Sequence, residues 1–470
     1  MKTIHTYDIG ILEDFDATET ALKINKKEIS REEAVACAID RAMFANPSIN
    51  AIVTPDFERA LTNANKKYSN NGVFAGVPTF IKDLNDYAGL PTLMGSCGTP
   101  SIPKQKNDPV VEQILKVTDS IVLGKSSSSE YGLLPCGETL QQGNTLNPWN
   151  LGHSTGGSSA GSAALVAAGV VPFAHANDGG GSIRIPASCC GLVGLKPSRG
   201  RNVSSQSAMA PIDMAVDGIV CRSVRDAANY FYGLEQFYTN PNLPKIGKVE
   251  HFDKKRLKIA VFTKSTTDVE SHGDVVDATM NAAKLCESLG HQIEFIDNPI
   301  SYQFNKDFLM YWSFLSFGSI LLEYQKYGLK FNPLKATKFT KDLAKAYPFL
   351  SIPSVFSIKR LKQYNELYSQ LFNKYDVLLS PTLSHPAPPI GHYGPNVGTL
   401  EVIFRLNSYV NFTTLQNITG APAISLPMGM SKDRLPIGIQ FAANVGEEAK
   451  LLSLAFEVER VNKFLKINEF

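Results

Sequence analysis

The sequence predicts a protein of the α/β class. Helix and strand signals alternate along all 470 residues, and the chain has 43% hydrophobic and 19% charged residues, an ordinary balance for a globular protein. This composition excludes a disordered chain and a coiled coil. The length favours about three domains, although large α/β enzymes often reach it as one unit.

Capping and breaking residues predict the first elements. Ser30 and Glu33 fit a capping box, in which each side chain accepts a hydrogen bond from the other residue's backbone, ahead of a helix over 34–43. Asn46-Pro47 should end this helix, because proline has no N–H to donate. Residues 49–53 then have the pattern of a short strand.

A βαβ-like unit is predicted in the second half of the chain. Residues 234–256, rich in Asn, Pro and charged side chains, form an exposed connection that leads into it. Strands are expected over 257–262 and 292–296. The helix between them spans 274–289, and Gly290 closes it.

The last third of the chain combines helices with strands that contain proline. Apolar residues at helical spacing predict a helix over 354–375, and strands are expected around 380–382 and 421–427. Residues 302–331 contain ten aromatic side chains in thirty, against one in ten overall. Such a segment is either a core helix or a helix that lines a pocket, because so dense a run cannot all face one side.

Charge and cysteine content restrict the partners and the compartment. The 46 Lys and Arg against 44 Asp and Glu leave a net charge of +2, so no strong field towards nucleic acid or anionic lipid is expected. No Lys/Arg run is longer than residues 254–256. The seven cysteines include no C-x-x-C spacing, which favours reduced, mostly buried thiols in a cytoplasmic protein.

No segment has the pattern of a membrane span or a signal peptide. The first sixteen residues are polar and acidic, without the apolar run of a signal peptide. The longest uncharged apolar run, 308–322, has 15 residues, fewer than the roughly 20 that a spanning helix requires.

The first of three unusual segments is rich in glycine and serine. Thirteen of the sixteen residues 154–169 are Gly, Ser or Ala. The segment could be a small-residue helix packed on a sheet, above all over 163–168, or a phosphate-binding loop, although the lysine of the Walker pattern is missing. Residues 157–161 also match the nucleophile-elbow pattern with Ser159 at its centre, which would need a histidine such as His385 or His392.

The second segment is a glycine turn before a serine. Gly179, Gly180 and Gly181 precede Ser182 and can aim successive backbone N–H groups into one concavity, as an oxyanion hole requires. A flexible loop is the alternative. Asp178 and Arg184 flank the turn and could pair across it.

The third segment ends in a lysine. Lys82 follows the apolar run of residues 76–81, an unusual place for a lysine unless it is paired or catalytic. The simplest alternative is a lysine whose amine reaches the surface and pairs with Asp83.

Together these segments resemble the amidase signature family. The patterns G-V-P-x-x-x-K-D at 76–83, G-G-S-S-x-G-S at 156–162 and D-x-G-G-S-I-R-x-P at 178–186 occur in the family's order. Flanking matches at 147–149, 194–197 and 435–440 extend the resemblance over roughly residues 20–460. The pattern is most similar to the aminohexanoate cyclic-dimer hydrolase branch.

The resemblance implies a Ser–cis-Ser–Lys triad. Ser182 corresponds to the nucleophile, Ser158 to the bridging serine after a cis peptide bond, and Lys82 to the base. It further implies an oxyanion hole of Gly179, Gly180, Gly181 and Ser182, supporting roles for Ser159, Asp178 and Arg184, and no metal or cofactor.

The chemistry of these residue types agrees with those roles. A serine hydroxyl is a weak nucleophile unless a neighbour takes its proton. A lysine, with an ordinary pKa of about 10.4, can serve as that base only if burial keeps it neutral. Two departures from the family pattern, Asn177 and Ala160, stand where a threonine and a glycine are usual, and we expect neither to touch the triad.

The fold and function follow as expectations of the resemblance. We expect one domain over 1–470 with a twisted mixed β-sheet covered by helices on both faces. Its parts would be a signature core at about 70–225, a variable substrate-side region at about 234–375, and a C-terminal core segment at about 376–460.

The expected activity is hydrolysis of an amide through an acyl-Ser182 intermediate. Part of the aromatic segment at 302–331 would wall the acyl pocket and favour apolar or linear-chain amides. The alternatives are the glutaminase-type A subunit of a tRNA-dependent amidotransferase, an inactive binding protein, and an α/β-hydrolase that uses Ser159. The expected partner is a small amide, with no nucleic acid, and a homodimer is the assembly to test.

Overall fold

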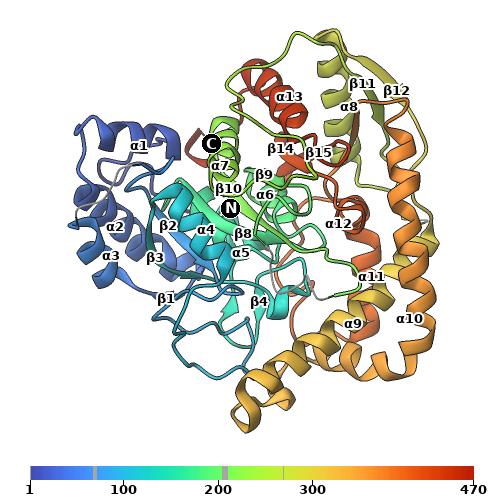
Figure 1. Ribbon diagram of the computed structural model, residues 1–470, viewed down its shortest axis with the longest axis horizontal. Helices are drawn as coiled ribbons and strands as arrows, with labels where there is room; N and C mark the ends of the chain where they lie inside the picture. Colours follow the sequence, from blue (N-terminus) through green and yellow to red (C-terminus); the bar gives the residue numbers. More distant parts are fainter. Residues whose placement is uncertain (1, 67–70, 204–209, 268, 470) are drawn as a thin grey trace.

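The core of the protein is an eight-stranded mixed sheet (Figure 1). The computed structural model describes residues 2–66, 71–203, 210–267 and 269–469. The first three strands of the sheet run parallel, and all later neighbours pair antiparallel. Within these residues the spatial order is β12 (Gln292–Phe295), β11 (Lys258–Val261), β13 (Val377–Pro381), β15 (Pro436–Ala442), β14 (Ala423–Met430), β9 (Val193–Lys196), β10 (Val216–Cys221) and β8 (Phe173–Asp178).

A smaller, three-stranded sheet lies beside β8, and one of its edge strands ends at Lys82. Its order is β1 (Ile52–Pro55), β3 (Ile121–Ser126) and β2 (Pro78–Lys82), with β2 parallel to β3. All five residues of β2 are buried, and the Thr79 hydroxyl donates to the Phe173 carbonyl at 3.1 Å. Two short hairpins, β4 (Glu138–Thr139) with β5 (Gly143–Asn144) and β6 (Leu146–Asn147) with β7 (Asn150–Ser154), connect the small sheet to the centre.

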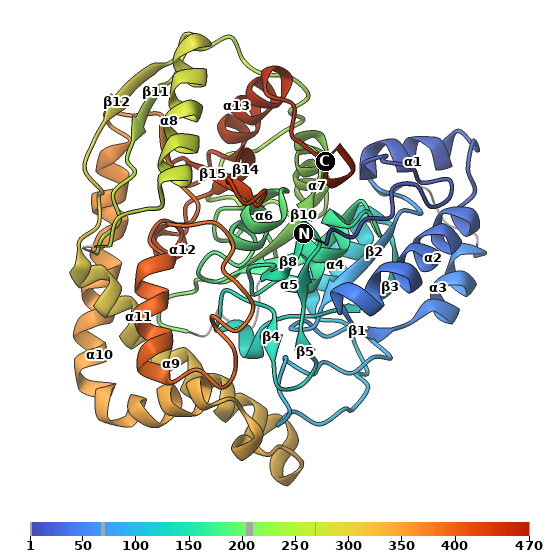
Figure 2. The same ribbon diagram turned by 180° about the vertical axis from the view of Figure 1, so that it is seen from behind.

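Helices cover the large sheet on both faces (Figures 1 and 2), as the family resemblance implies. One hydrophobic cluster runs from Leu12 to Phe464 and joins the two sheets. No helix in the described part of the chain is both long and apolar enough to cross a bilayer. The helices outside the α9–α11 region are α1 (Ala17–Asn25), α2 (Arg31–Ile49), α3 (Phe57–Ala64), α4 (Pro109–Thr118), α5 (Ala160–Ala167), α6 (Arg184–Cys190), α7 (Val224–Phe237), α8 (Gly273–Ser288), α12 (Thr414–Thr419) and α13 (Glu448–Val461).

Several predicted elements are present. The Ser30–Glu33 capping box begins α2. The βαβ unit exists as β11, α8 and β12, with the two strands parallel. The expected strands near 380 and 424 are β13 and β14. The exposed connection starts a few residues later than expected, because α7 continues to Phe237.

The prediction that Asn46-Pro47 ends the first helix is wrong. The helix continues to Ile49, and β1 begins at Ile52 rather than at residue 49. Pro47 lies in the last turn, where its missing N–H removes a single helical bond. The Asn50 N–H still donates to the Asn46 carbonyl at 2.8 Å, and the Asn46 side chain accepts from the next two backbone N–H groups.

Three helices form a cap beside the sheet, at the bottom and right of Figure 1. The cap consists of α9 (Tyr302–Tyr327), α10 (Lys338–Leu371) and α11 (Thr399–Tyr409), which lie side by side also in the view from behind (Figure 2). The sequence predicted α10 only from residue 354, but the helix starts at Lys338 and includes Pro348 and Pro353. Packing against α9 holds this first half helical despite the two missing N–H groups.

Candidate active site

Lys82 is fully buried at the end of β2, and its amine contacts two neutral side chains. The Nζ donates to Ser158 Oγ at 2.7 Å and to Asn177 Oδ1 at 2.6 Å. Burial lowers the pKa of Lys82 to about 7, against the opposing influence of the Asp217 and Asp178 carboxylates. A lysine in this state can accept a proton near neutral pH.

The alternative in which Lys82 pairs with Asp83 is wrong. Asp83 instead pairs with Lys125, whose Nζ lies 3.1 Å from Asp83 Oδ1, and both side chains are fully buried. Asp83 is the first residue after β2, and its side chain turns towards Lys125 of β3 rather than towards Lys82. Within the described residues Lys82 forms no salt bridge.

Ser158 lies in the turn before α5 and follows a cis Gly157–Ser158 peptide bond. Glycine is required before it, because a Cβ on Gly157 would lie 2.4 Å from the backbone nitrogen of Cys136. The small-residue helix that the sequence predicted, above all over 163–168, is also present as α5, and every residue of this helix is buried in the core.

Ser159 does not form a nucleophile elbow with a histidine. Its side chain is fully buried, and its hydroxyl donates to the Asn177 carbonyl at 3.3 Å. His385 bonds the Pro386 carbonyl and stacks on Tyr409. In the described chain no histidine hydrogen-bonds Ser159, which argues against the α/β-hydrolase alternative.

Asp178 and Arg184 pair across the glycine turn, as the sequence predicted. Asp178 Oδ2 accepts from Arg184 Nε at 2.9 Å, and Asp178 Oδ1 accepts from the Gly181 N–H at 2.7 Å. Although burial alone would raise the pKa of Asp178, the Arg184 charge holds it well below its usual range. The guanidinium also donates to Gln440 at 2.8 Å, so the pair fixes the turn to the central strand β15.

Ser182 follows this turn directly and precedes α6. Gly181 has a φ of +129°, which favours glycine, and its N–H is already engaged by Asp178. The expectation that all four N–H groups from Gly179 to Ser182 face one oxyanion is therefore corrected. The N–H groups of Gly179, Gly180 and Ser182 make no hydrogen bond to another described residue and remain available.

Asn177 is the partner that sequence reasoning missed. We expected this departure from the family pattern not to touch the triad, yet its Oδ1 accepts directly from the Lys82 amine. Its Nδ2 donates to Asn85 Oδ1 at 3.1 Å, which sets the orientation of the amide. The other departure is as expected: Ala160 packs near Gly137, away from the triad.

His175 lies two residues before Asn177 on β8 and supports the same lysine. Its Nδ1 accepts from the Lys82 backbone N–H at 3.3 Å, and its Nε2 lies 3.0 Å from Asp217 Oδ1. Residues two apart share one face of a strand. This alternation was the available signal that both side chains of β8 point towards Lys82.

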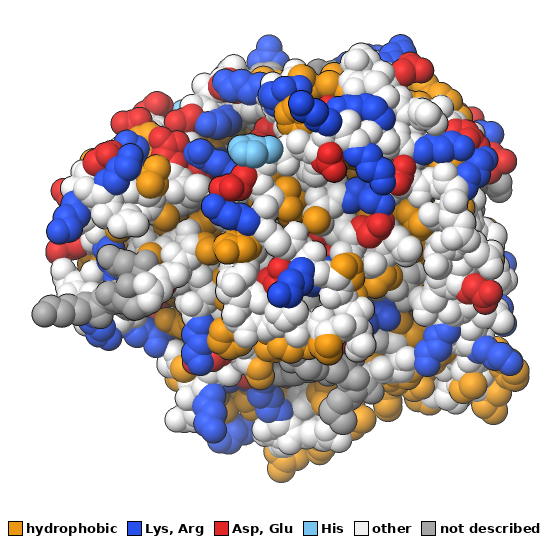
Figure 3. Space-filling view, turned by 45° about the horizontal axis from the view of Figure 1, so that its top comes forward, with side chains coloured by type: hydrophobic (Ala, Val, Ile, Leu, Met, Phe, Trp, Pro, Cys, Tyr) orange, Lys and Arg blue, Asp and Glu red, His pale blue; other side chains and the backbone are white. Residues whose placement is uncertain are grey.

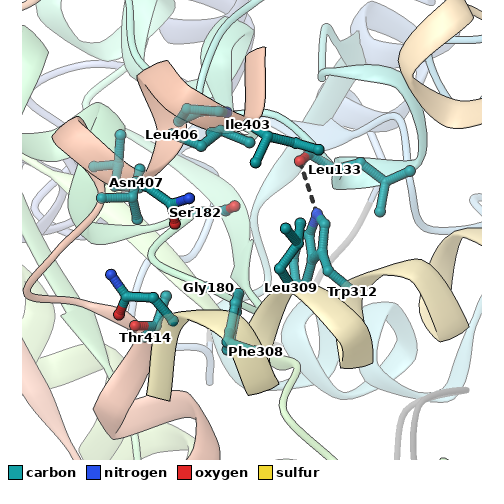
Figure 4. Close-up of a pocket in the computed structure, with 14 residues that line it drawn as sticks. Leu133, Gly180, Ser182, Phe308, Leu309, Trp312, Ile403, Leu406, Asn407 and Thr414 are labelled. Carbon is teal, nitrogen blue, oxygen red and sulfur yellow. Dashed lines mark hydrogen bonds between the residues drawn. The ribbon is translucent and has the colours of Figure 1, made fainter. Parts of the chain in front are cut away.

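The Ser182 hydroxyl faces an open cavity of about 650 Å³ between α9 and α11 (Figure 4). None of the described side chains that line it is charged. The Trp312 indole in its wall is held by a 3.0 Å hydrogen bond from Nε1 to the Leu133 carbonyl. The lining is Leu133, Pro135, Gly180, Ser182, Ile185, Asn305, Phe308, Leu309, Trp312, Ile403, Leu406, Asn407, Val410 and Thr414.

In the ranges that the structure describes, no cluster of three or more His, Cys, Asp or Glu side chains is arranged to hold a metal ion. The local chemistry is that of Ser182 at the cavity and of a second serine, Ser158, in contact with a buried lysine whose pKa is lowered to about 7. Such a group can transfer an acyl group to the first serine.

Comparisons with known proteins agree with this chemistry. A family model described as "Amidase" matches residues 33–452. "Putative amidase AmiC" of Mycobacterium leprae is 39% identical over 472 residues, which cover 99% of each chain. The 6-aminohexanoate-cyclic-dimer hydrolase of Paenarthrobacter ureafaciens is 31% identical over 494 residues, 94% of each chain. A solved structure of 6-aminohexanoate cyclic dimer hydrolase superposes with a TM-score of 0.86 at 28% identity, over 96% of this chain and 97% of that one.

Proposed function

Because the chain belongs to the amidase family, we propose that it hydrolyses amides with Ser182 as nucleophile, Ser158 as proton relay and Lys82 as base. The enzyme is an amidase that acts on carbon–nitrogen amide bonds, and its relatives favour this activity over that of an amidotransferase A subunit. The observation that most supports these proposed roles is the 2.7 Å hydrogen bond between the Lys82 amine and Ser158 Oγ.

Acylation begins when Ser182 Oγ attacks the carbonyl carbon of the amide. Its proton passes to Ser158 Oγ, and the Ser158 proton passes to the neutral Lys82 amine. The carbonyl oxygen becomes an oxyanion, which the N–H groups of Gly179, Gly180 and Ser182 stabilise. Return of a proton through Ser158 to the amide nitrogen releases an amine or ammonia and leaves acyl-Ser182.

Deacylation uses the same groups in the same order. Water gives a proton to the Ser158–Lys82 pair and attacks the acyl carbon. Collapse of the second tetrahedral intermediate breaks the bond to Ser182 Oγ, and the returned proton restores the hydroxyl. The products are a carboxylate and the free enzyme.

The cavity supports an uncharged, largely apolar acyl group as the substrate class. Phe308 and Trp312 stack on each other with ring centroids 5.2 Å apart and form one wall. An unpaired charge in such a site would lose its hydration without compensation, so an acyl chain with a free carboxylate fits poorly. Asn305 and Asn407 offer hydrogen bonds to a polar group within a longer substrate, such as a second amide.

The proposal also includes three expectations from the sequence: a single domain, a cytoplasmic location and a homodimer. One hydrophobic cluster extends through the signature core and the C-terminal segment, which supports a single amidase domain over residues 1–470. All seven cysteines are unpaired and six are buried, which supports the cytoplasmic location. The homodimer has no support from the described residues, which belong to a single chain, and light scattering of the purified protein would test it.

Removing any member of the triad should stop catalysis. We expect Ser182→Ala and the near-isosteric Lys82→Met each to lower kcat/KM by at least about 10³-fold, because nucleophile and base act as one unit. Ser158→Ala should be nearly as severe, and the double variant Ser182→Ala/Lys82→Met no worse than either single one. Steady-state hydrolysis of a chromogenic amide measures this. His385→Ala is the control, and the triad assignment fails if this variant loses more activity than Lys82→Met.

The pH dependence tests the contact between Asn177 and Lys82. Lys82 accepts a proton only when neutral, so kcat/KM should rise as pH increases through about 7, the pKa of Lys82. Asn177→Asp places a carboxylate beside the amine and should raise that pKa by about 1–3 units. The rising limb then moves to higher pH, and activity at pH 7 falls by about fivefold or more.

Asn242→Asp adds the same charge at an exposed position and serves as the control. Its profile should match that of the unchanged enzyme. An Asn177→Asp profile that also matches would show that Lys82 is not the titrating base.

The cavity wall should select substrates by the size of the acyl group. Trp312→Ala and Phe308→Ala should raise KM by roughly tenfold or more for long or aromatic amides, because each removes a large apolar contact, and should change KM little for acetamide. Phe317→Ala, an aromatic of the same helix that packs on Tyr347 instead, is the control. Equal effects on both substrates together with a lower melting temperature would assign Phe308 and Trp312 to the core.

A further inference from the structure

One segment of the chain, from the end of α9 through most of α10, concentrates positive charge that the composition conceals. Residues 326–362 contain nine Lys and Arg and one acidic residue, Asp342, a net charge of +8. The whole chain carries only +2, so the remainder has a net charge of −6. The basic residues do not form a run. They are spread over the end of α9, the following turn and α10. Three of these basic side chains are paired: Lys326 with Asp86, Lys338 with Asp342 and Arg360 with Asp307.

The same region exposes large apolar side chains. On α10, Phe349 is 87% exposed, Ile352 74% and Phe356 60%. The opposite side of α10 packs into the protein through residues such as Leu343 and Leu361. A solvent-facing stripe of three such side chains is unfavourable unless something covers it.

Apolar and basic residues occupy one face of α10. Lys345, Phe349, Ile352, Phe356 and Lys359 follow one another at intervals of four, three, four and three residues, so they line one side of the helix. Lysine thus ends the apolar stripe on both sides, and all five side chains are exposed. In the space-filling view, hydrophobic side chains gather beside Lys and Arg along the lower right edge (Figure 3).

The cap is connected to the cavity that Ser182 faces. On α11, Leu400 is 82% and Phe404 62% exposed, while Ile403 and Leu406 of the same helix line the cavity. Glu130, in the one-turn helix Glu130–Gly132 that leads to the cavity residue Leu133, accepts from the Thr337 N–H at the start of α10 at 2.9 Å. A surface bound to the cap would therefore lie beside the substrate cavity.

The positive charge of this face decides which partner could cover it: a second copy of the chain, a nucleic acid or a lipid bilayer. In a symmetric dimer through this face the same patch would meet itself, and the exposed lysines Lys345, Lys359 and Lys362 of the two copies would repel each other. Nucleic acid would match the charge but would leave Phe349, Ile352 and Phe356 uncovered. An anionic bilayer matches both, because apolar side chains enter the headgroup boundary while lysines reach the phosphates.

We propose that the basic, apolar face of α10, with Leu400 and Phe404 of α11, docks the enzyme on an anionic phospholipid surface. The helix lies in the plane of the interface and does not cross the bilayer. Docking places the apolar cavity beside the lipid, where amides with apolar acyl chains collect. The docking itself does not depend on the catalytic assignment, since none of the docking residues lines the cavity.

Vesicle flotation of the purified full-length enzyme tests the proposal. Two vesicle types are compared: phosphatidylcholine alone, and phosphatidylcholine with part replaced by phosphatidylglycerol. The enzyme should float with the second type and not the first, and added salt should release it. Replacing Lys345, Lys359 and Lys362 by Gln should weaken binding by roughly 100-fold, at about fivefold for each lysine near the surface.

A second variant and two controls separate docking from general charge and folding. Phe349→Ser/Ile352→Ser/Phe356→Ser should also lose vesicle binding while keeping the melting temperature and the hydrolysis of a short-chain amide. The controls are Lys245→Gln/Lys254→Gln/Lys255→Gln, with the same change in charge on the exposed connection, and Met43→Ser/Phe44→Ser on the exposed face of α2; both should bind as the unchanged enzyme does.

Three outcomes would overturn the proposal. The first is no flotation with anionic vesicles. The second is equal loss of binding in the cap and control variants. The third is self-association in light scattering that the Phe349, Ile352 and Phe356 variant abolishes, which would identify the face as an interface between two copies of the chain.

Discussion

The proposed active site depends on a lysine amine that is buried among neutral partners. Ser158 and Asn177 accept its hydrogen bonds, and burial brings its pKa down to about 7. A carboxylate in contact would stabilise the ammonium form and remove the base. The arrangement of strands, glycines and ion pairs around Lys82 satisfies this one requirement.

The nearby acids are each occupied by another group. Asp83 pairs with Lys125, and Asp178 is held by Arg184. Asp217, which lies close enough to influence Lys82, hydrogen-bonds His175. These pairs do more than hold the fold, because each keeps a carboxylate from contacting the proposed base while fixing a segment that carries a proposed catalytic group. Asp178 in addition orders the turn before Ser182 by accepting from the Gly181 N–H.

The sequence predicted what depends on local pattern and missed what depends on distant contacts. Glycine and serine spacing was enough to find the turn that ends in Ser182, and an isolated lysine after apolar residues indicated Lys82. The contact of Asn177 with Lys82 has no local signal in the sequence, because the two residues are 95 positions apart. The end of α2 was misplaced because Asn46 compensates for the proline that follows it. The basic face of α10 was missed because its lysines follow helical spacing rather than a run.

The central claim, that a neutral Lys82 activates Ser182 through Ser158, is tested most directly by covalent labelling across pH. A fluorophosphonate reacts with an activated serine and leaves a phosphonylated residue that peptide mass spectrometry locates. The account predicts a label on Ser182, formed at a rate that rises with pH through about 7 and is lost in the Lys82→Met variant. Labelling of Ser159, or a rate on Ser182 that survives the loss of Lys82, would contradict it.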